Sequence, residues 1–313
     1  MKLALCTDVL AELNVMQMLD RVKQYGISGV EMTAGGWSPC PHVATDELLA
    51  SPAKLAAFRG ELEKREMRIV ALNCSGNPLA PGALGEKHTA SSYKTLELAG
   101  KLGVKKIVMM SGLPGGCAED KTPNWITSTV SWPDYMPGVI DYQWNQVAIP
   151  WWQDFARHAA EHGVEQIALE AFPSQLVYNA STLLRLRGAV GDIIGMNLDP
   201  SHLIAMGADP IAAARKLEGA IYHVHGKDAR IERGLADIDG LLEYKPVTDT
   251  KNRAWNYVAV GCGQDLQWWK TFFSVLRMTG YNGDVSLEME DLTMSVEAGL
   301  RTSIDAFNAT LSQ

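Results

Sequence analysis

Residues 193–228, IIGMNLDPSHLIAMGADPIAAARKLEGAIYHVHGKD, contain two predicted strands joined by a predicted helix. The apolar runs Ile193–Leu198 and Ala220–His225 are typical of buried strands, and the apolar spacing of Pro210–Leu217 is typical of a helix. Polar side chains stand where each strand ends. This arrangement indicates one strand–helix–strand unit of a parallel sheet.

The same alternation recurs along the rest of the chain. We predict eight strands, at Leu3–Thr7, Ile27–Thr33, Arg68–Asn73, Lys105–Met110, Glu165–Glu170, Ile193–Leu198, Ala220–His225 and Asp284–Met289. The expected helices are Leu13–Tyr25, Asp46–Arg65, Ser91–Leu102, Trp151–His162, Ser181–Val190, Pro210–Leu217, Leu266–Thr279 and Ser295–Leu311. Eight such units close a barrel, whereas a doubly wound sheet needs a glycine-rich turn after its first strand, which is missing here. We therefore predict an α/β fold, a (β/α)8 TIM barrel forming a single domain over residues 1–313.

Two predicted connections are unusually long, at 111–150 after the fourth strand and 226–265 after the seventh. Loops beyond about 12–15 residues in a compact domain are usually functional or disordered. Their tryptophans argue against disorder: these are Trp125, Trp132, Trp144 and Trp255, with Trp37 after the second strand. Because barrel enzymes carry their active site where the strands end, these aromatics are expected near a substrate, although they can also simply pack the loops.

The composition excludes several classes of protein. The 28 Lys and Arg against 36 Asp and Glu give a net charge of −8, which argues against nucleic-acid binding. No apolar run approaches the roughly 18 residues of a membrane helix, and the first residues do not resemble a signal peptide. The five cysteines contain no CxxC pair, which favours reduced thiols. We expect a cytoplasmic protein with no membrane or nucleic-acid partner.

Four consecutive predicted strands end in a side chain that can bind a hard metal ion. These side chains are Glu170, Asp199, His225 and Glu288. Since the carboxyl ends of barrel strands meet at one rim, the four are expected to converge. Three converging carboxylates repel one another unless a cation lies between them. The set therefore predicts a divalent metal site for Mn²⁺, with Mg²⁺, Co²⁺ or Zn²⁺ as alternatives.

Other polar residues near these strand ends are candidates for substrate contacts. In His223-Val224-His225 we expect only one imidazole to face the site, and we choose His225 because it lies nearer the strand's end. His202 is expected to contact substrate, and Lys227 to hold a substrate oxygen. Both are counted as catalytic candidates, together with Glu170 and Glu288. The remaining predicted substrate contacts are Glu31 at the end of the second strand, His88 opening the third helix, Asn73, Trp125, Asp228 and Arg230.

Three segments, Asn197–Leu203, His223–Asp228 and Ser286–Asp291, resemble signatures of the xylose isomerase-like barrels. That broad group includes sugar phosphate isomerases/epimerases, ketohexose 3-epimerases, inosose dehydratases and endonuclease IV. The resemblance runs from Leu3 to about Leu300 and implies a divalent ion, often Mn²⁺, at the four residues named above.

Two further segments, Ala71–Pro78 and Ser111–Gly116, resemble a bacterial subgroup labelled sugar phosphate isomerase/epimerase. One departure from the family pattern is Gln264, which stands where many relatives have histidine. If that histidine is a general acid in the relatives, this chain lacks it.

The predicted site favours a metal-dependent isomerase or epimerase of a keto- or aldose sugar. A divalent ion can stabilise the enolate that forms when a base removes the proton next to a carbonyl. We expect Glu170 and Glu288 on opposite sides of the ion to serve the two faces of that carbon. The alternative is a lyase or dehydratase that eliminates a β leaving group from a 3-oxo-sugar or 3-oxo-glycoside. The resemblance extends to such C-glycoside deglycosidases, which work with a small second subunit.

Two other classes are weaker. A DNA-repair endonuclease of this fold needs a histidine-rich trinuclear zinc site and a basic surface, unlike a chain with seven histidines and a charge of −8. A metal-free sugar-binding barrel is the remaining alternative. The expected partner is a small-molecule sugar, and a homo-oligomer or a small second subunit stays open.

Overall fold

The main sheet of the protein is a closed barrel with the strand order β1-β10-β7-β6-β5-β4-β3-β2. A computed structural model describes residues 1–127 and 136–311. The barrel strands are β1 Lys2–Cys6, β2 Gly29–Thr33, β3 Arg68–Asn73, β4 Lys106–Met110, β5 Gln166–Glu170, β6 Ile194–Leu198, β7 Ile221–Gly226 and β10 Asp284–Leu287. Neighbouring strands pair in parallel, for example β1 with β10 and β4 with β5. The predicted (β/α)8 TIM barrel is therefore confirmed.

The chain divides into two compact units. The first comprises Met1–Glu31, Leu62–Val70 and Met196–Gln313, and the second comprises Met32–Glu61 and Ala71–Gly195. The first unit contains η1 Thr7–Leu10, α1 Val15–Gln24, α8 Pro200–Ala205, α9 Pro210–Lys216, α10 Arg233–Asp239, α11 Leu266–Met278 and α12 Val296–Thr310. The second contains α2 Thr45–Ala50, most of α3 Pro52–Lys64, α4 Ala83–Leu102, α5 Met136–Asp141, the π-helix η2 Tyr142–Ala148, α6 Ile149–Glu161 and α7 Ala180–Val190.

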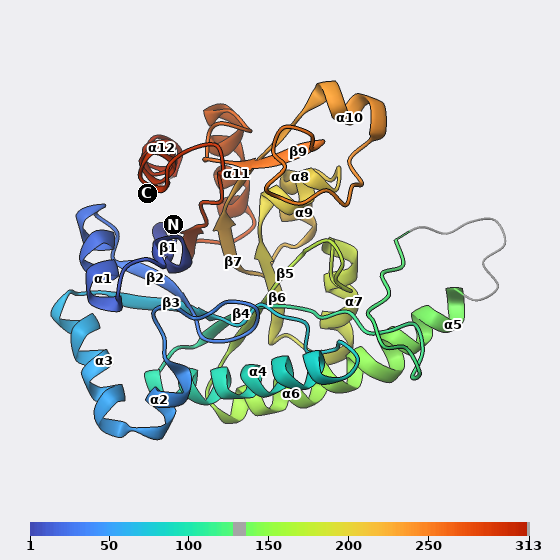
Figure 1. The fold of residues 1–313 in the computed structure, drawn as a ribbon, viewed down its shortest axis with the longest axis horizontal. Coiled ribbons are helices and arrows are strands. Elements are labelled where there is room, and N and C mark those ends of the chain that lie inside the picture. Colours follow the sequence, from blue (N-terminus) through green and yellow to red (C-terminus); the bar gives the residue numbers. More distant parts are fainter. Residues whose placement is uncertain (128–135, 312–313) are drawn as a thin grey trace. The chain divides into compact units, whose positions relative to one another are not determined.

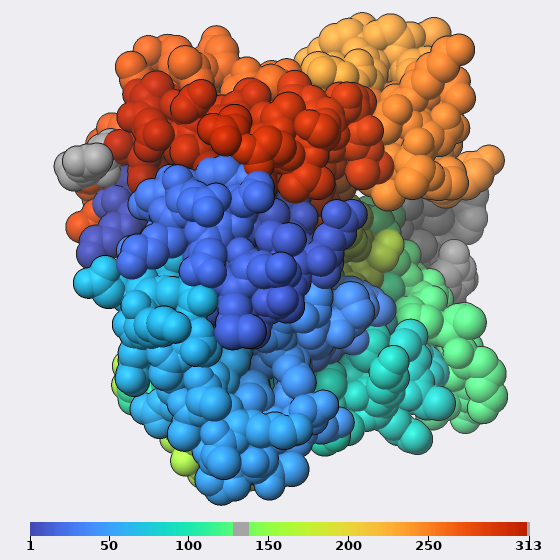
Figure 2. All heavy atoms as spheres, turned by 60° about the vertical axis from the view of Figure 1, so that its left-hand side comes forward, coloured from blue at the N-terminus to red at the C-terminus, as the bar shows by residue number. Residues whose placement is uncertain are grey.

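In the first unit, α11 and α12 bury an aromatic cluster. Trp269 packs edge-on against Phe307 with 5.7 Å between ring centroids, and Phe273 lies 5.8 Å from the same ring. Phe307 also contacts the end of β7, where a Cβ on Gly226 would lie 2.3 Å from its ring, so only glycine fits there. On the surface α1 lies beside α12 (Figure 2), and Arg21 and Tyr25 both contact Glu297.

In the second unit, α4 and α6 run side by side (Figure 1). Trp152 and Phe155 of α6 are fully buried, with 5.6 Å between their ring centroids. The Trp152 indole also donates a hydrogen bond to the carbonyl of Ser111 just after β4. This contact fixes the start of the long connection that follows β4.

Some predicted helix boundaries were wrong. The helix expected over Asp46–Arg65 is two helices, α2 and α3, because Ser51 precedes Pro52 and takes an extended conformation that ends α2. The helix expected from Ser91 begins at Ala83, so His88 lies inside α4 and does not open it. The short helix α8 was not predicted, although Asp199 caps it and Pro200 occupies its first position.

Both long connections contain regular structure. The first holds α5 and η2. The second holds α10 and an antiparallel pair, β8 Asp228–Ile231 with β9 Trp255–Val258, which contacts α8. Trp132 lies outside the described residues. Within the described ranges, no helix is both long and apolar enough to cross a bilayer.

Candidate active site

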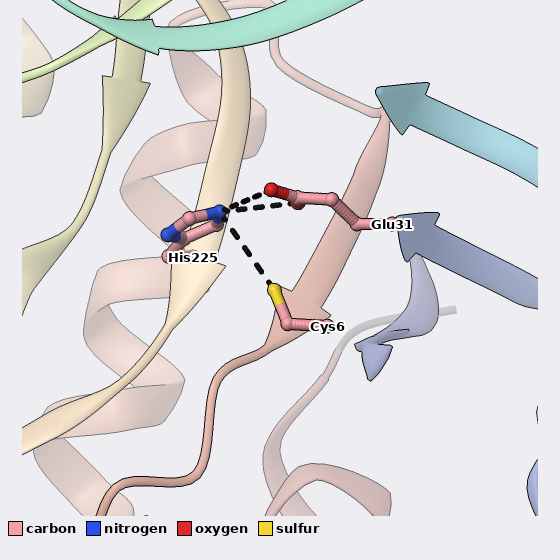
Figure 3. Close-up of side chains that lie close together, drawn as sticks. All are labelled: Cys6, Glu31 and His225. Carbon is pink, nitrogen blue, oxygen red and sulfur yellow. Dashed lines mark hydrogen bonds and ion pairs between the residues drawn. The ribbon is translucent and has the colours of Figure 1, made fainter. Parts of the chain in front are cut away.

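His225 lies at the end of β7, buried at the centre of a polar cluster in the first unit. Its Nε2 lies 3.0 and 3.1 Å from the two carboxylate oxygens of Glu31 (Figure 3). The thiol of Cys6 lies 3.9 Å from the same nitrogen. The register of β1 and β2 places Cys6 beside Glu31, so the pairing of these two strands makes the two residues neighbours.

His223 lies on the same side of β7 as His225, and this corrects the expectation that the two imidazoles face opposite ways. Residues two apart on a strand share a face. The Nε2 of His223 lies 2.8 Å from Glu31 Oε2 and 2.9 Å from Ser286 Oγ. One carboxylate therefore serves two imidazoles, whose ring centroids are 5.7 Å apart.

The other nitrogen of His225 faces two acidic side chains. Nδ1 lies 3.0 Å from Glu288 Oε2 and 3.9 Å from Asp199 Oδ2. Asp199 is buried at the end of β6, and its Oδ1 accepts hydrogen bonds from the backbone N–H and hydroxyl of Ser201, both at 2.7 Å. Oδ1 thus caps α8, while Oδ2 faces His202 and His225.

Lys227 follows His225 closely and is buried against two glutamates. Its Nζ lies 3.3 Å from Glu288 Oε2 and 2.7 Å from Glu290 Oε2. The ammonium also stands 4.4 Å from the centre of the Tyr257 ring. A cation held over an aromatic face by two carboxylates keeps a fixed position.

Tyr257, which was not predicted as a site residue, closes the cluster. Its hydroxyl lies 3.0 Å from Nδ1 of His202, and Nε2 of His202 lies 3.2 Å from Asp199 Oδ2. His202 is fully buried between these two partners, so it holds Asp199 in place. Tyr257 comes from β9 of the small sheet, and the only hint of it in the sequence was the length of the connection.

The electrostatics of the cluster are those of buried ion pairs. Burial opposes ionisation of Glu31, but the two imidazoles outweigh it and hold the pKa of its carboxyl well below the usual range. Burial likewise opposes charge on His225, yet Glu31, Cys6 and Glu288 raise its pKa well above the usual value. Burial raises the pKa of the Cys6 thiol, which favours the neutral form.

The pKa of Lys227 is set by the same two opposing effects, burial and neighbouring charges. Burial alone would lower the pKa of its ammonium, but Glu288 and Glu290 raise it well above the ordinary lysine value. Lys227 is therefore a charged hydrogen-bond donor in this cluster.

Three of the four predicted metal ligands lie together in the first unit. One ligand atom from each of Asp199, His225 and Glu288 is within 4.8 Å of the others. Two carboxylates and one imidazole are a donor set that suits Mn²⁺, Mg²⁺ or Zn²⁺. A metal-binding imidazole usually bonds a carboxylate or carbonyl through its other nitrogen, and Glu31 is that partner for Nε2 of His225. The side chains present fit a divalent ion.

Glu170, the fourth predicted ligand, ends β5 in the second unit, where it is buried. It stays a predicted ligand.

Asp228 is fully buried and anchors the turn at 261–264. Its carboxylate accepts hydrogen bonds from the backbone N–H groups of Gly261, Gly263 and Gln264 and from the Trp269 indole. The close approach of the turn needs Gly263, where a Cβ would lie 2.4 Å from a carbonyl oxygen. These bonds give Asp228 a structural task, and its predicted substrate contact stays a prediction.

Gln264, the residue that departs from the family pattern, is also engaged in this turn. Its side-chain amide donates a hydrogen bond to the carbonyl of Ala229 at 3.2 Å. It lines a separate cavity together with Asp209 and Trp268. Arg230 of β8 pairs with Glu232 at 2.8 Å.

The other predicted contacts belong to the second unit. Asn73 Oδ1 accepts the backbone N–H of Ser75. His88 Nδ1 accepts the N–H of Asn77 at 2.8 Å, and burial lowers the pKa of this imidazole. Its ring packs edge-on against Trp37. Trp125 packs edge-on against Tyr178 with 5.7 Å between centroids.

Comparison with known proteins matches this chain to one family. The family described as xylose isomerase-like TIM barrel matches residues 19–310. The chain is similar to a Bacillus subtilis (strain 168) protein named uncharacterized protein YfiH, with 62% identity over 313 residues that cover both proteins completely.

Three solved structures share the fold at low sequence identity. The probable 3-DHS dehydratase AsbF of Bacillus anthracis has a TM-score of 0.68 and 17% identity, covering 98% of this chain and 99% of that one. The IOLI protein with a bound zinc atom has a TM-score of 0.66 and 18% identity, covering 100% of both chains. A D-tagatose 3-epimerase-like protein has a TM-score of 0.64 and 16% identity, covering 99% and 98%. Dehydratase and epimerase names both occur on this fold.

Proposed function

This chain belongs to the xylose isomerase-like TIM barrel family, and we propose that it is a divalent-metal-dependent isomerase or epimerase of a (keto)sugar or sugar derivative. The observation that carries the proposal is the arrangement around His225. Glu31 holds its Nε2, while its Nδ1 faces Asp199 and Glu288. A buried imidazole oriented in this way between carboxylates is typical of a metal ligand.

Glu170, Asp199, His225 and Glu288 would hold the ion, with Mn²⁺ as the first choice. When bound, a divalent ion lowers the free energy of an enolate by polarising the carbonyl and the adjacent hydroxyl. The bound zinc of the IOLI protein supports the choice of a divalent cation on this fold.

Proton transfer falls to the glutamates in this proposal. The side chain of Glu288 is 25% exposed, whereas those of Asp199 and His225 are almost fully buried, so Glu288 is accessible to a substrate. We assign to Glu288 the removal of the proton next to the carbonyl, and to Glu170 the delivery of a proton to the other face. Epimerisation needs such a pair of groups.

Lys227 and His202 have supporting roles. The charged Nζ of Lys227, 3.3 Å from Glu288 Oε2, is placed to donate a hydrogen bond to a substrate oxygen that gains negative charge. His202, bonded to Tyr257 and Asp199, positions the Asp199 carboxylate, and its predicted contact with substrate stays a prediction.

Elimination is the second candidate. An enolate with a leaving group at the β position expels it, and the enzyme is then a lyase or dehydratase acting on a 3-oxo-sugar or 3-oxo-glycoside. The similarity to the probable 3-DHS dehydratase AsbF favours this alternative. Both reactions begin with the same proton removal, so both need the same site residues.

Proton NMR in D₂O distinguishes the two. The protein is loaded with Mn²⁺ and incubated with ketohexoses and, separately, with a 3-oxo-glucoside, and an EDTA-treated sample serves as control. Deuterium at the carbon next to the carbonyl together with a new sugar supports the isomerase or epimerase. Release of the aglycone supports the lyase.

Variants assign the base in the same assay. Glu288→Gln should abolish deuterium incorporation, while Glu12→Gln, at an exposed glutamate of the same unit, should leave it unchanged. Activity that survives complete metal removal would contradict the proposal.

A further inference from the structure

An aromatic cavity in the second unit shares no lining residue with the cluster around His225. Its volume is about 140 Å³, and its walls include Trp125, Trp144, Tyr178 and Arg185. These residues belong to the segments that follow β4 and β5. An apolar cavity of roughly 150 Å³ is known to accept benzene, so this one has room for a single ring.

The walls of this cavity, named here the Trp125 pocket, are built by unusual local structure. Trp144 is carried by η2, a seven-residue π-helix, and π-helical segments are rare and frequently mark functional sites. Trp125 meets Tyr178 edge-on at an interplanar angle of 86°. Two aromatic side chains held at right angles offer one face and one edge to a planar ligand.

Two glutamines of the pocket, Gln143 and Gln175, help to fix its shape. The side-chain amide of Gln143 donates to the carbonyls of Gly115 and Asn124, which anchors the segment before Trp125. The Oε1 of Gln175 accepts the backbone N–H of Gly112 at 2.8 Å. The pocket is thus held in shape by bonds from both connections.

Trp125 and Arg185 offer two donors to a ligand in this pocket. The indole Nε1 of Trp125 is buried and has no hydrogen-bond partner within residues 1–127 and 136–311. The guanidinium of Arg185 lies 4.2 Å from the centre of the Trp144 ring and, across the same described residues, pairs with no carboxylate. Asp141 is the nearby acid, but its oxygens accept hydrogen bonds from Asn145 and Gln146.

A buried donor without an acceptor costs free energy, and an arginine stacked on an indole keeps its edge donors for an oxyanion. We propose that the Trp125 pocket binds an aromatic ring that carries a carboxylate, with Trp125 Nε1 and Arg185 as the donors to that carboxylate. The proposal does not rest on the metal site, because the pocket is lined by none of the four proposed metal ligands.

The test measures the binding of benzoate to the whole 313-residue chain by saturation-transfer NMR and calorimetry. Benzyl alcohol supplies the ring without the charge, and acetate supplies the charge without the ring. Benzoate should bind more tightly than either. Arg185→Gln should weaken benzoate binding by about tenfold or more and leave benzyl alcohol nearly unchanged.

Two further variants complete the design. Trp125→Phe keeps a ring but removes the indole donor, and it should weaken benzoate binding about fivefold. Arg59→Gln, at an exposed arginine of α3 outside the pocket, should have no effect. The proposal is overturned if acetate binds as well as benzoate, if benzoate does not bind, or if folded Arg185→Gln and Trp125→Phe proteins bind it like the wild type.

Discussion

Glu31 is a buried carboxylate that accepts hydrogen bonds from two imidazoles, those of His223 and His225. A carboxylate bound to one nitrogen of an imidazole fixes its tautomer, so that the other nitrogen keeps a lone pair for a metal ion. We therefore assign Glu31 a positioning role in the proposed site. It was predicted as a substrate contact.

The first prediction concerns this role. Glu31→Gln should weaken Mn²⁺ binding by about 10–100-fold, because an amide cannot replace the charged partner of both histidines. Isothermal titration calorimetry measures the affinity, and circular dichroism checks the fold. Glu12→Gln is the matched control. Equal Mn²⁺ affinities in the wild type and Glu31→Gln would show that Glu31 does not support metal binding.

Asp228 provides a prediction about pH. Burial raises the pKa of its carboxyl from 3.8 to about 6, even though several N–H groups donate to it. Between these two values the folded protein binds more protons at Asp228 than the unfolded chain does. The contribution of this group to the free energy of unfolding is therefore fully present below pH 3.8 and is lost as the pH rises through about 6.

The measurement compares wild type with Asp228→Asn by urea unfolding at several pH values. The difference in their free energies of unfolding should shift by about 2.4 kcal/mol in favour of the asparagine variant between pH 4 and pH 7. Parallel pH profiles for the two proteins would show that Asp228 titrates normally in the folded state.

The small sheet of β8 and β9 is the part of the fold that was hardest to predict from the sequence. Asp228 pairs with Val258 and Arg230 with Asn256, so strands separated by a long excursion lie side by side. A short hairpin can be predicted from the residues of its two-residue turn, whereas a long segment separates β8 from β9. The pairing depends on tertiary contacts with α8, and Tyr257 reaches His202 only because of it.

The barrel strands, by contrast, were predictable because each is a short apolar run between helical segments. The predicted strand Arg68–Asn73 agrees with β3, and Glu165–Glu170 differs from β5 by a single residue. The helix predicted over Asp46–Arg65 failed because Pro52 is compatible both with a kinked helix and with a break.

Packing between elements gives the third prediction. Gly226→Ala should destabilise the protein by about 1–3 kcal/mol, since the new methyl group would overlap the Phe307 ring. Gly234→Ala in α10 is the matched control: nothing lies near its Cβ, and alanine should stabilise that helix by about 0.5–1 kcal/mol. Thermal and urea unfolding measure both. Destabilisation by the two changes to the same degree would contradict the close contact of β7 with α12.

At the scale of the whole molecule, metal binding should be coupled to stability. An ion that binds only the folded state raises the free energy of unfolding by about 2.7 kcal/mol at a concentration one hundred times its dissociation constant. We expect Mn²⁺ to raise the melting temperature by several degrees, and EDTA to reverse the increase. A melting temperature that does not respond to Mn²⁺, Mg²⁺, Co²⁺ or Zn²⁺ would contradict a metal site in the fold.

Topology explains how much of the site was predictable. Parallel strands of one barrel end at one rim, so a polar residue at each strand end is a reasonable ligand candidate, and Asp199, His225 and Glu288 do lie together. The roles of His223, Glu31 and Tyr257 depend on side-chain packing across distant segments. A single sequence carries no direct signal for such packing.

The most direct test of the proposed metal site is a Mn²⁺ titration followed by electron paramagnetic resonance, with wild-type protein and Glu170→Gln. We predict one tightly bound ion per wild-type chain and a large loss of affinity in Glu170→Gln, while Glu12→Gln binds like the wild type. If the wild type binds no Mn²⁺, or if Glu170→Gln binds it equally well, the proposed four-residue metal site is wrong.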